Sequence, residues 1–114
     1  MSTISLRYTW AQSLFAQKDY TRAATILAEL LDEATREEIL HGTTDLELLL
    51  ARAYYHSAQL GRAEQVLVGI LEREPNEAYA RLLMGRTLQR QQRHDEARGH
   101  IALAKALGQP VDNA

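Results

Sequence analysis

The chain repeats itself, and this repetition constrains its fold more than any other feature. In each repeat a large aliphatic residue follows an alanine by four positions: Ala23 and Leu27, Ala63 and Leu67, Ala97 and Ile101. The second and third alanines are 34 residues apart, and the first and second are 40 apart. A repeat period of about 20–50 residues indicates an architecture in which each unit buries its apolar face only against its neighbours.

Apolar residues within the repeats recur with the period of an α-helix. Residues 23–31 and 63–71 both follow the i, i+3, i+4 spacing of an amphipathic helix, and strand patterns are absent. We therefore predict helices near residues 4–17, 20–40, 45–58, 61–74, 77–91 and 94–107. In this prediction Thr44 opens the third helix through a capping box with Glu47, and Asn76 caps the fifth helix.

A period of 34 residues with this order of small and large side chains resembles the tetratricopeptide repeat. The middle repeat, about residues 44–77, is the best match and carries Leu50-Ala51, Tyr54, Ala63, Leu67 and Pro75. Glu47 replaces the leading tryptophan of the family pattern, and the flanking repeats cover about 4–37 and 78–111. The resemblance implies an all-α fold, a right-handed superhelical stack of three helix-turn-helix repeats (an α-solenoid), in one domain over residues 1–114.

Two departures from strict repetition carry further expectations. Residues 38–43 are inserted and are expected to prolong the second helix, so that Ile39 and Leu40 either fold back over the junction or contact a partner. His100 and Lys105 stand where the first two repeats have apolar residues. We therefore expect the last helix to be a polar cap and the three repeats to be complete.

Composition excludes several functional classes. The chain has no cysteine, so thiolate catalysis and cysteine-bound zinc are excluded. A net charge of −2 and a pI near 6.1 do not provide the broad basic field of a general nucleic-acid binder. Neither a membrane span nor a secretory signal is recognisable, and the expected compartment is therefore the cytoplasm.

Candidate chemistry is sparse. The four histidines show no metal-binding spacing, and the glycines form no phosphate-binding loop, so we expect no metal, no cofactor and no enzymatic activity. His94 occupies the position of Tyr20 and Leu60 in the other repeats, which favours a packed structural histidine.

The resemblance implies a peptide-binding groove lined by the first helix of each repeat. The matching positions of this sequence that we select as the candidate site are Tyr8, Gln12, Phe15, Asp45, Leu48, Arg52, Tyr55, Tyr79, Leu82, Arg86 and Arg90. The Lys/Asn/Arg clamp with which chaperone-binding members hold a terminal carboxylate is absent, since the matching positions include Tyr8, Gln12 and Tyr79.

Arg52 and Arg86 occupy equivalent positions in adjacent repeats. Either they accept an acidic group between them, or Arg52 pairs locally with Glu47 or Asp45 and Arg86 is solvated, and both alternatives stay open. The expected partner is a protein or peptide segment with acidic or amphipathic character; a membrane is not expected, and nucleic acid is disfavoured although residues 78–114 carry a charge of +3. A homo-oligomer using Leu103 and Leu107, or a small chaperone, is the alternative.

Overall fold

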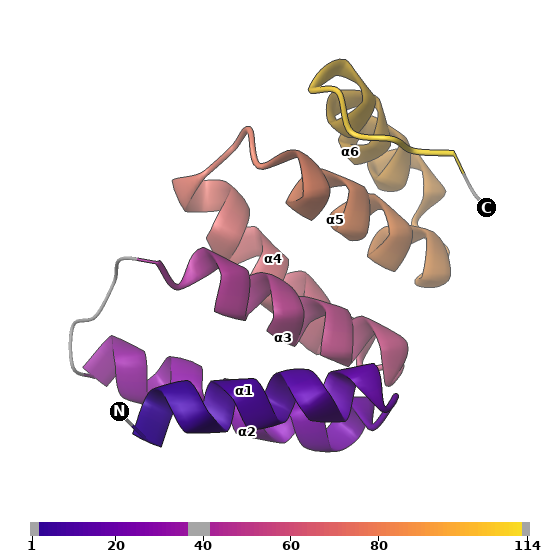
Figure 1. Cartoon of the computed structure of the whole chain (residues 1–114). Helices are drawn as coiled ribbons and strands as arrows, with labels where there is room; N and C mark the ends of the chain where they lie inside the picture. Colours follow the sequence, from indigo (N-terminus) through magenta and orange to yellow (C-terminus); the bar gives the residue numbers. More distant parts are fainter. Residues whose placement is uncertain (1–2, 37–41, 113–114) are drawn as a thin grey trace. The chain divides into compact units, whose positions relative to one another are not determined.

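The computed structural model describes residues 3–36 and 42–112, and these residues form helices joined by short turns, without a strand (Figure 1). The helices of the described chain are α1 (Thr3–Ala16), α2 (Tyr20–Arg36), α3 (Thr44–His56), α4 (Leu60–Arg73), α5 (Ala78–Arg90) and α6 (His94–Ala106). The all-α prediction is confirmed, and each predicted helix is present. The part of the second helix predicted beyond Arg36, including Ile39 and Leu40, lies outside the described residues.

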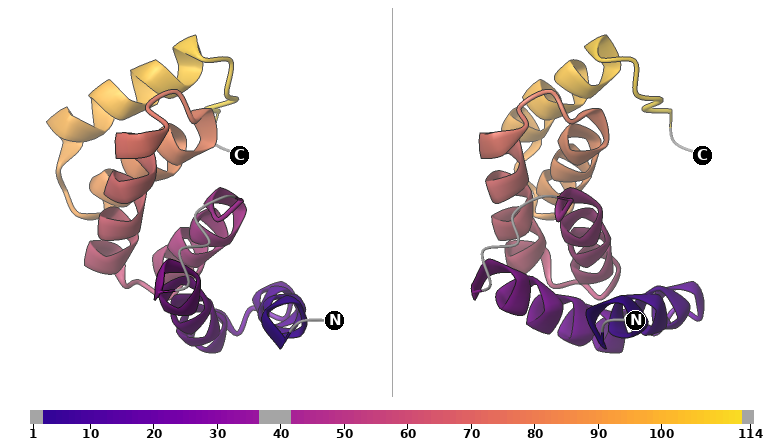
Figure 2. Two further views of the ribbon diagram at one scale, coloured as in Figure 1. Left: turned by 90° about the vertical axis from the view of Figure 1, so that its left-hand side faces the viewer. Right: turned by 60° about the vertical axis from the view of Figure 1, so that its left-hand side comes forward.

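The chain divides into two compact units, Met1–Gln59 with α1 to α3 and Leu60–Ala114 with α4 to α6. The first two helices of the first unit form a helical hairpin, and so do the last two helices of the second unit (Figure 2). The boundary between the units falls inside the middle repeat predicted at 44–77. A single domain over residues 1–114 stays a prediction.

The turn between the two helices of a repeat has the same conformation three times. Lys18, Ala58 and Gln92 occupy the same place in successive repeats and have φ values of 65°, 61° and 64°. In each turn the next residue donates its amide to a carbonyl five positions back, at Leu14, Tyr54 and Leu88, with N–O distances of 2.8–2.9 Å. These bonds end a helix through a left-handed residue, a position that usually favours glycine.

Burial follows the repeat pattern that the sequence shows. The anchoring alanines are at most 1% exposed, and the large residues Leu27 and Leu67 are fully buried. The leucines that precede the anchors by nine positions, Leu14 and Leu88, are also buried. The self-similar positions therefore supply much of the apolar core, as expected for helices with one apolar face.

Gly85 shows why each repeat needs a small residue in its first helix. A Cβ at this position would lie 2.4 Å from Cγ1 of Ile101 and 3.3 Å from the carbonyl oxygen of Ala97. α5 and α6 therefore approach closely here, and the equivalent residues Ala11 and Ala51 are fully buried.

Two predicted helix caps are wrong by one residue each. α3 begins after Thr43, whose hydroxyl donates to the Glu47 carboxylate at 2.9 Å and accepts no backbone amide. α5 is capped by Glu77, whose carboxylate accepts from the amide of Ala80 at 2.7 Å. Asparagine is the commoner residue at such a position, but here the carboxylate of Glu77 accepts the amide three residues after it.

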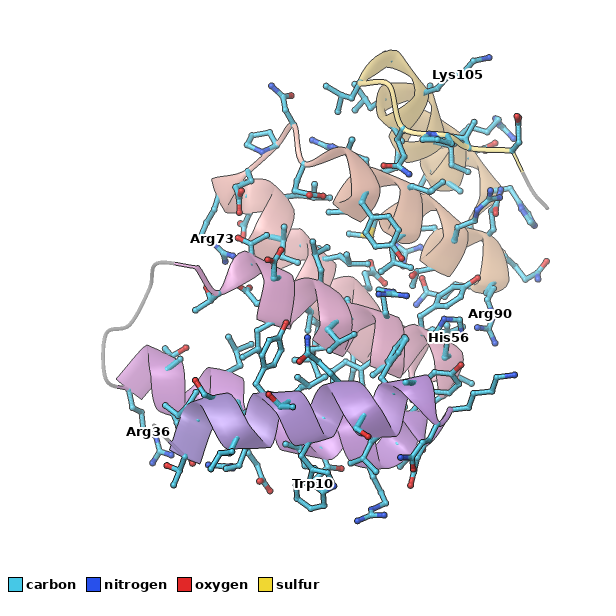
Figure 3. The ribbon with its side chains drawn as sticks, viewed as in Figure 1. Trp10, Arg36, His56, Arg73, Arg90 and Lys105 are labelled. Carbon is cyan, nitrogen blue, oxygen red and sulfur yellow. The ribbon has the colours of Figure 1, made fainter. Side chains whose placement is uncertain are left out.

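Two other residues, His94 and His100, lie in different environments from those predicted. His94 is exposed and contacts Gln92, so it is not a packed structural histidine. His100 is half-buried beside Arg81, whereas Lys105 is exposed as expected of a polar cap (Figure 3). Trp10 is 50% exposed, although its equivalents Leu50 and Met84 are buried, and its ring lies against Arg22.

Candidate functional site

The predicted site residues lie on the first helix of each repeat, and the structure brings those of α1 and α3 together. On α1, Tyr8 and Phe15 are half-buried and Gln12 is exposed. On α3, Asp45 is exposed, while Leu48, Arg52 and Tyr55 are half-buried, following a spacing that places them along one helix face: 45, 48, 52 and 55.

Phe15 is the centre of a cluster of aromatic and cationic side chains in the first unit. The Arg52 guanidinium lies 4.7 Å from the centre of the Phe15 ring, within the range of a cation–π interaction. The same ring meets Tyr20 and His56 edge-on, with centroid distances of 5.0 and 5.8 Å. We call Phe15, Tyr20, Arg52, Tyr55 and His56 the aromatic cluster.

His56 joins the remaining members of the aromatic cluster. Its ring stacks on Tyr20 with a centroid distance of 4.7 Å and meets Tyr55 edge-on at 5.4 Å. His56 itself is exposed, and the other four members are only half-buried. The cluster is therefore a preformed surface in which ring faces and one guanidinium are already oriented.

Tyr8 extends the same surface toward the beginning of α3. Burial, and secondly the negative charge of Asp45, raise the pKa of Tyr8 above its ordinary value. Tyr8 also lines a pocket of about 210 Å³ together with Leu46 and Ala34. The first unit thus presents aromatic side chains from both ends of α1 beside α3.

The predicted site residues of the second unit lie along one face of α5. Tyr79 and Leu82 are half-buried, and Arg90 is exposed. Arg86 is not a bare cation, because its Nη2 donates to the carbonyl oxygen of Val111 at 2.7 Å and its Nη1 to Gln89 at 3.5 Å. The segment after α6 therefore already contacts Arg86. That Arg52 and Arg86 hold an acidic group between them stays a prediction.

Most arginines of the basic C-terminal third have partners. Arg93 contacts Glu64 at 2.7 Å and Glu96 at 2.7 Å, and Arg98 contacts Asp95. The two carboxylates raise the pKa of Arg93 above its ordinary range. The charges of Arg93 and Arg98 are therefore offset by carboxylates of the same unit.

Sequence reasoning missed Tyr20 as a site residue. Its position in the repeat, shared with Leu60 and His94, is that of a packing residue, so the repeat pattern alone assigns it to the core. Only the turn between α1 and α2 brings its ring beside Phe15 and His56. The available signal was the concentration of aromatic residues at the ends of these helices.

Two further features are absent from the described part of the chain. It contains no group of three His, Cys, Asp or Glu side chains that could hold a metal ion. None of its helices has the length and the apolarity needed to cross a bilayer.

Comparison with known families places these observations in context. A family model described as tetratricopeptide repeat matches residues 14–86, from the end of α1 into α5, which is more than half of the chain. The search of curated proteins found no match to the chain.

Proposed function

Because the chain belongs to the tetratricopeptide repeat family, whose repeats generally mediate protein–protein interaction, we propose that it is a non-catalytic scaffold that binds a peptide segment of a partner protein. The binding surface is the face of the first helices, with the aromatic cluster as its main anchor. Tyr8, Gln12, Asp45 and Leu48 extend this surface in the first unit. In the second unit, taken by itself, the equivalent face of α5 carries Tyr79, Leu82, Arg86 and Arg90.

The observation that carries the proposal is the half-buried aromatic cluster. Tyrosine, other aromatic residues and arginine are enriched at the energetic centres of protein interfaces, where the aromatic rings offer large contact areas at low cost in conformational entropy. Here Arg52, Phe15 and His56 already hold one another in place. When a ligand covers them, these side chains lose little conformational entropy, since the rings are ordered before the ligand binds.

The partner is a peptide or protein segment with apolar side chains and an acidic group. The apolar side chains pack on Phe15 and Tyr55, and the acidic group approaches Arg52. Exposed ion pairs contribute only about 0–1 kcal/mol, so the rings supply most of the affinity and the arginine sets orientation and salt dependence. The protein acts in the cytoplasm in this proposal.

Affinity capture from the native host, followed by mass spectrometry, tests the proposal. The wild type is compared with Tyr55→Ala and with Arg36→Gln, a control whose arginine is 70% exposed and paired only with Asp32 among the described residues. We expect partners that are captured by the wild type and the control and lost by Tyr55→Ala. Equal capture by all three proteins contradicts binding at the aromatic cluster.

Self-association is a second candidate, favoured by apolar side chains on the surface. Leu103 on α6 and Leu107 directly after it are 47% and 39% exposed, and Leu6 on α1 is 56% exposed. Sedimentation velocity separates the two functions: a monomer at micromolar concentration eliminates the oligomer, and a dimer that Leu103→Gln dissociates supports it.

A further inference from the structure

The second unit contains a pocket that the groove of the family does not explain. It has a volume of about 370 Å³ and is bounded by α4, α5, the turn at Arg93 and α6. Its lining consists of Glu64, Val68, Leu71, Glu72, Arg81, Met84, Leu88, Arg93, Glu96 and His100.

The pocket lies on the opposite face of α5 from the candidate site. Tyr79, Leu82 and Arg86 follow one face of the helix, whereas Arg81, Met84 and Leu88 line the pocket. At 3.6 residues per turn the two sets are about half a turn apart. A ligand in this pocket therefore leaves the first-helix surface free.

The floor of the pocket is apolar. Leu71, Met84 and Leu88 are between 3% and 9% exposed, and they underlie Val68, which is 42% exposed. Val68 and Glu64 also line a second pocket, of about 450 Å³, that continues along α4 to Gly61. The continuous surface fits an elongated chain better than a compact small molecule.

The walls of the pocket differ in charge. At one end Glu64 and Glu96 both contact Arg93, so this guanidinium is already neutralised. At the other, Arg81 donates from Nε to the Pro75 carbonyl at 2.9 Å, and its Nη1 lies 3.2 Å from Nδ1 of His100. Among the described residues Arg81 has no carboxylate partner, and its Nη2 makes no hydrogen bond.

His100 makes this end of the pocket responsive to an anion. Burial, and secondly the charge of Arg81, lower the pKa of His100, while Glu96 acts in the opposite direction. The other charged groups that line the pocket are Glu64 and Glu72 from α4 and Arg93 from the turn. A carboxylate that bridges Arg81 and His100 replaces the hydrogen bond between Nη1 and Nδ1 and favours the imidazolium, so binding takes up a proton.

We propose that this pocket binds a peptide segment in which an acidic residue neighbours an apolar one, with the carboxylate held by Arg81 and His100 and the apolar side chain packed on Val68, Leu71 and Met84. Arginine is the side chain best suited to grip a carboxylate with two hydrogen bonds. Glu72 lies on the rim of the pocket, and its negative charge repels the carboxylate of the peptide. The carboxylate is therefore expected to bind at Arg81. The site is separate from the proposed first-helix surface.

Selection from a random-peptide library tests the proposal without knowledge of the natural partner. The library is selected on the wild-type chain after depletion on the double variant Arg81→Gln with Val68→Ser, which removes peptides that bind elsewhere. We expect surviving peptides to be enriched in Asp or Glu beside Leu, Ile or Phe. If no peptide survives the depletion, or if survivors lack an acidic residue, the proposal is wrong.

Affinities of a selected peptide make the test residue-specific. We expect Arg81→Gln to weaken binding about tenfold or more, because it removes charge-assisted hydrogen bonds. Val68→Ser, at an exposed position that tolerates change, is expected to weaken binding without altering the melting temperature, and Glu72→Gln to strengthen it. The control Arg98→Gln, whose arginine is 72% exposed and does not line the pocket, is expected to bind normally.

Dependence on pH provides an independent readout. Because binding takes up a proton at His100, affinity is expected to rise as the pH is lowered from about 7.5 to about 5.5, and His100→Gln to abolish that rise. Affinity that is independent of pH, or that falls with Arg98→Gln instead of Arg81→Gln, contradicts the proposal. Loss of binding in Tyr55→Ala concerns the first-helix surface, so failure of that surface and failure of the pocket are distinguishable.

Discussion

Single residues in the left-handed conformation end the first helix of every repeat without the help of glycine. Lys18, Ala58 and Gln92 all have φ near +60°, where a Cβ crowds the following carbonyl. This conformation costs a residue other than glycine or asparagine about 1–2 kcal/mol. The fold retains it three times because each turn directs the chain into the second helix of its repeat.

Ala58→Gly is therefore expected to stabilise the protein. Relief of strain exceeds the greater entropy that glycine loses on folding, which leaves a gain of about 0.5–1 kcal/mol in the free energy of unfolding. Urea denaturation measures the change. Ala102→Gly, at an exposed position inside α6, is the control and is expected to destabilise by about 0.5–1 kcal/mol. If both variants lose stability, the left-handed conformation at Ala58 is not strained.

Residue-scale chemistry also fixes the start of α5. Glu77→Ala is expected to destabilise by about 0.5–2 kcal/mol, because the amide of Ala80 loses its carboxylate acceptor. Asn76→Ala is expected to be nearly neutral. Thermal unfolding of the two variants compares them directly, and the opposite order of stability would restore Asn76 as the cap.

Pairs of helices are held together where one of them carries a small residue. α5 and α6 pack closely at Gly85. A Cβ at this position would collide with Ile101 and lie against the Ala97 carbonyl. The repeat pattern predicts a small residue here, but it does not show how little space remains. That distance depends on the crossing of the two helices, which periodicity alone does not specify.

Gly85→Ala is accordingly expected to destabilise the second unit by about 1–3 kcal/mol, through overpacking against Ile101. Gly99→Ala is the matched control, since its Cβ would meet nothing within 4 Å. It is expected to stabilise α6 by about 0.5–1 kcal/mol, because alanine is the better helix former. Equal effects of the two substitutions would show that α5 and α6 do not approach closely at Gly85.

The packing of α6 beside α5 also makes stability depend on pH. The lowered pKa of His100 means that the unfolded chain binds a proton there more readily than the folded chain. Stability therefore falls as the pH drops through the ordinary histidine pKa of 6.5. We expect His100→Gln to remove this part of the acid sensitivity, measured as the difference between the urea midpoints at about pH 7.5 and about pH 5.5. If the variant loses as much stability as the wild type between these pH values, His100 is not the responsible group.

Glu96 acts in a lower pH range. Its hydrogen bonds with Arg93 lower its pKa below the ordinary value of 4.5. The stability it contributes is therefore present above that value and is lost as the pH falls through the pKa of the folded state. The two residues thus affect different parts of one acid-denaturation curve.

At the scale of the whole molecule, the sequence predicts the fold better than the site. Repeat spacing identifies the helices and the buried alanines, because both follow from a period that every repeat shares. Arg86 and Tyr20 show what it misses. The contact of Arg86 with Val111 depends on where a turn at Gly108 sends the chain, and the contacts of Tyr20 depend on the angle between two helices.

The distribution of charge along the chain also predicts less than the structure shows. Residues 78–114 carry six basic and three acidic side chains, a pattern that suggests a surface for acidic ligands. In the structure Arg93 and Arg98 are paired with carboxylates, and Arg86 contacts a carbonyl. A count of charges does not show that Arg81 lacks an acidic partner among the described residues, whereas its contacts with the Pro75 carbonyl and His100 do.

The most direct test of the central claim, recognition of a partner segment by the aromatic cluster, is a comparison of dissociation constants for a captured partner peptide. Fluorescence anisotropy of the labelled peptide is measured with the wild type, Tyr55→Ala, Arg52→Gln and the control Arg36→Gln. If the rings supply most of the affinity, Tyr55→Ala weakens binding by about tenfold or more, Arg52→Gln by less, and the control not at all. Unchanged binding by Tyr55→Ala would contradict the account.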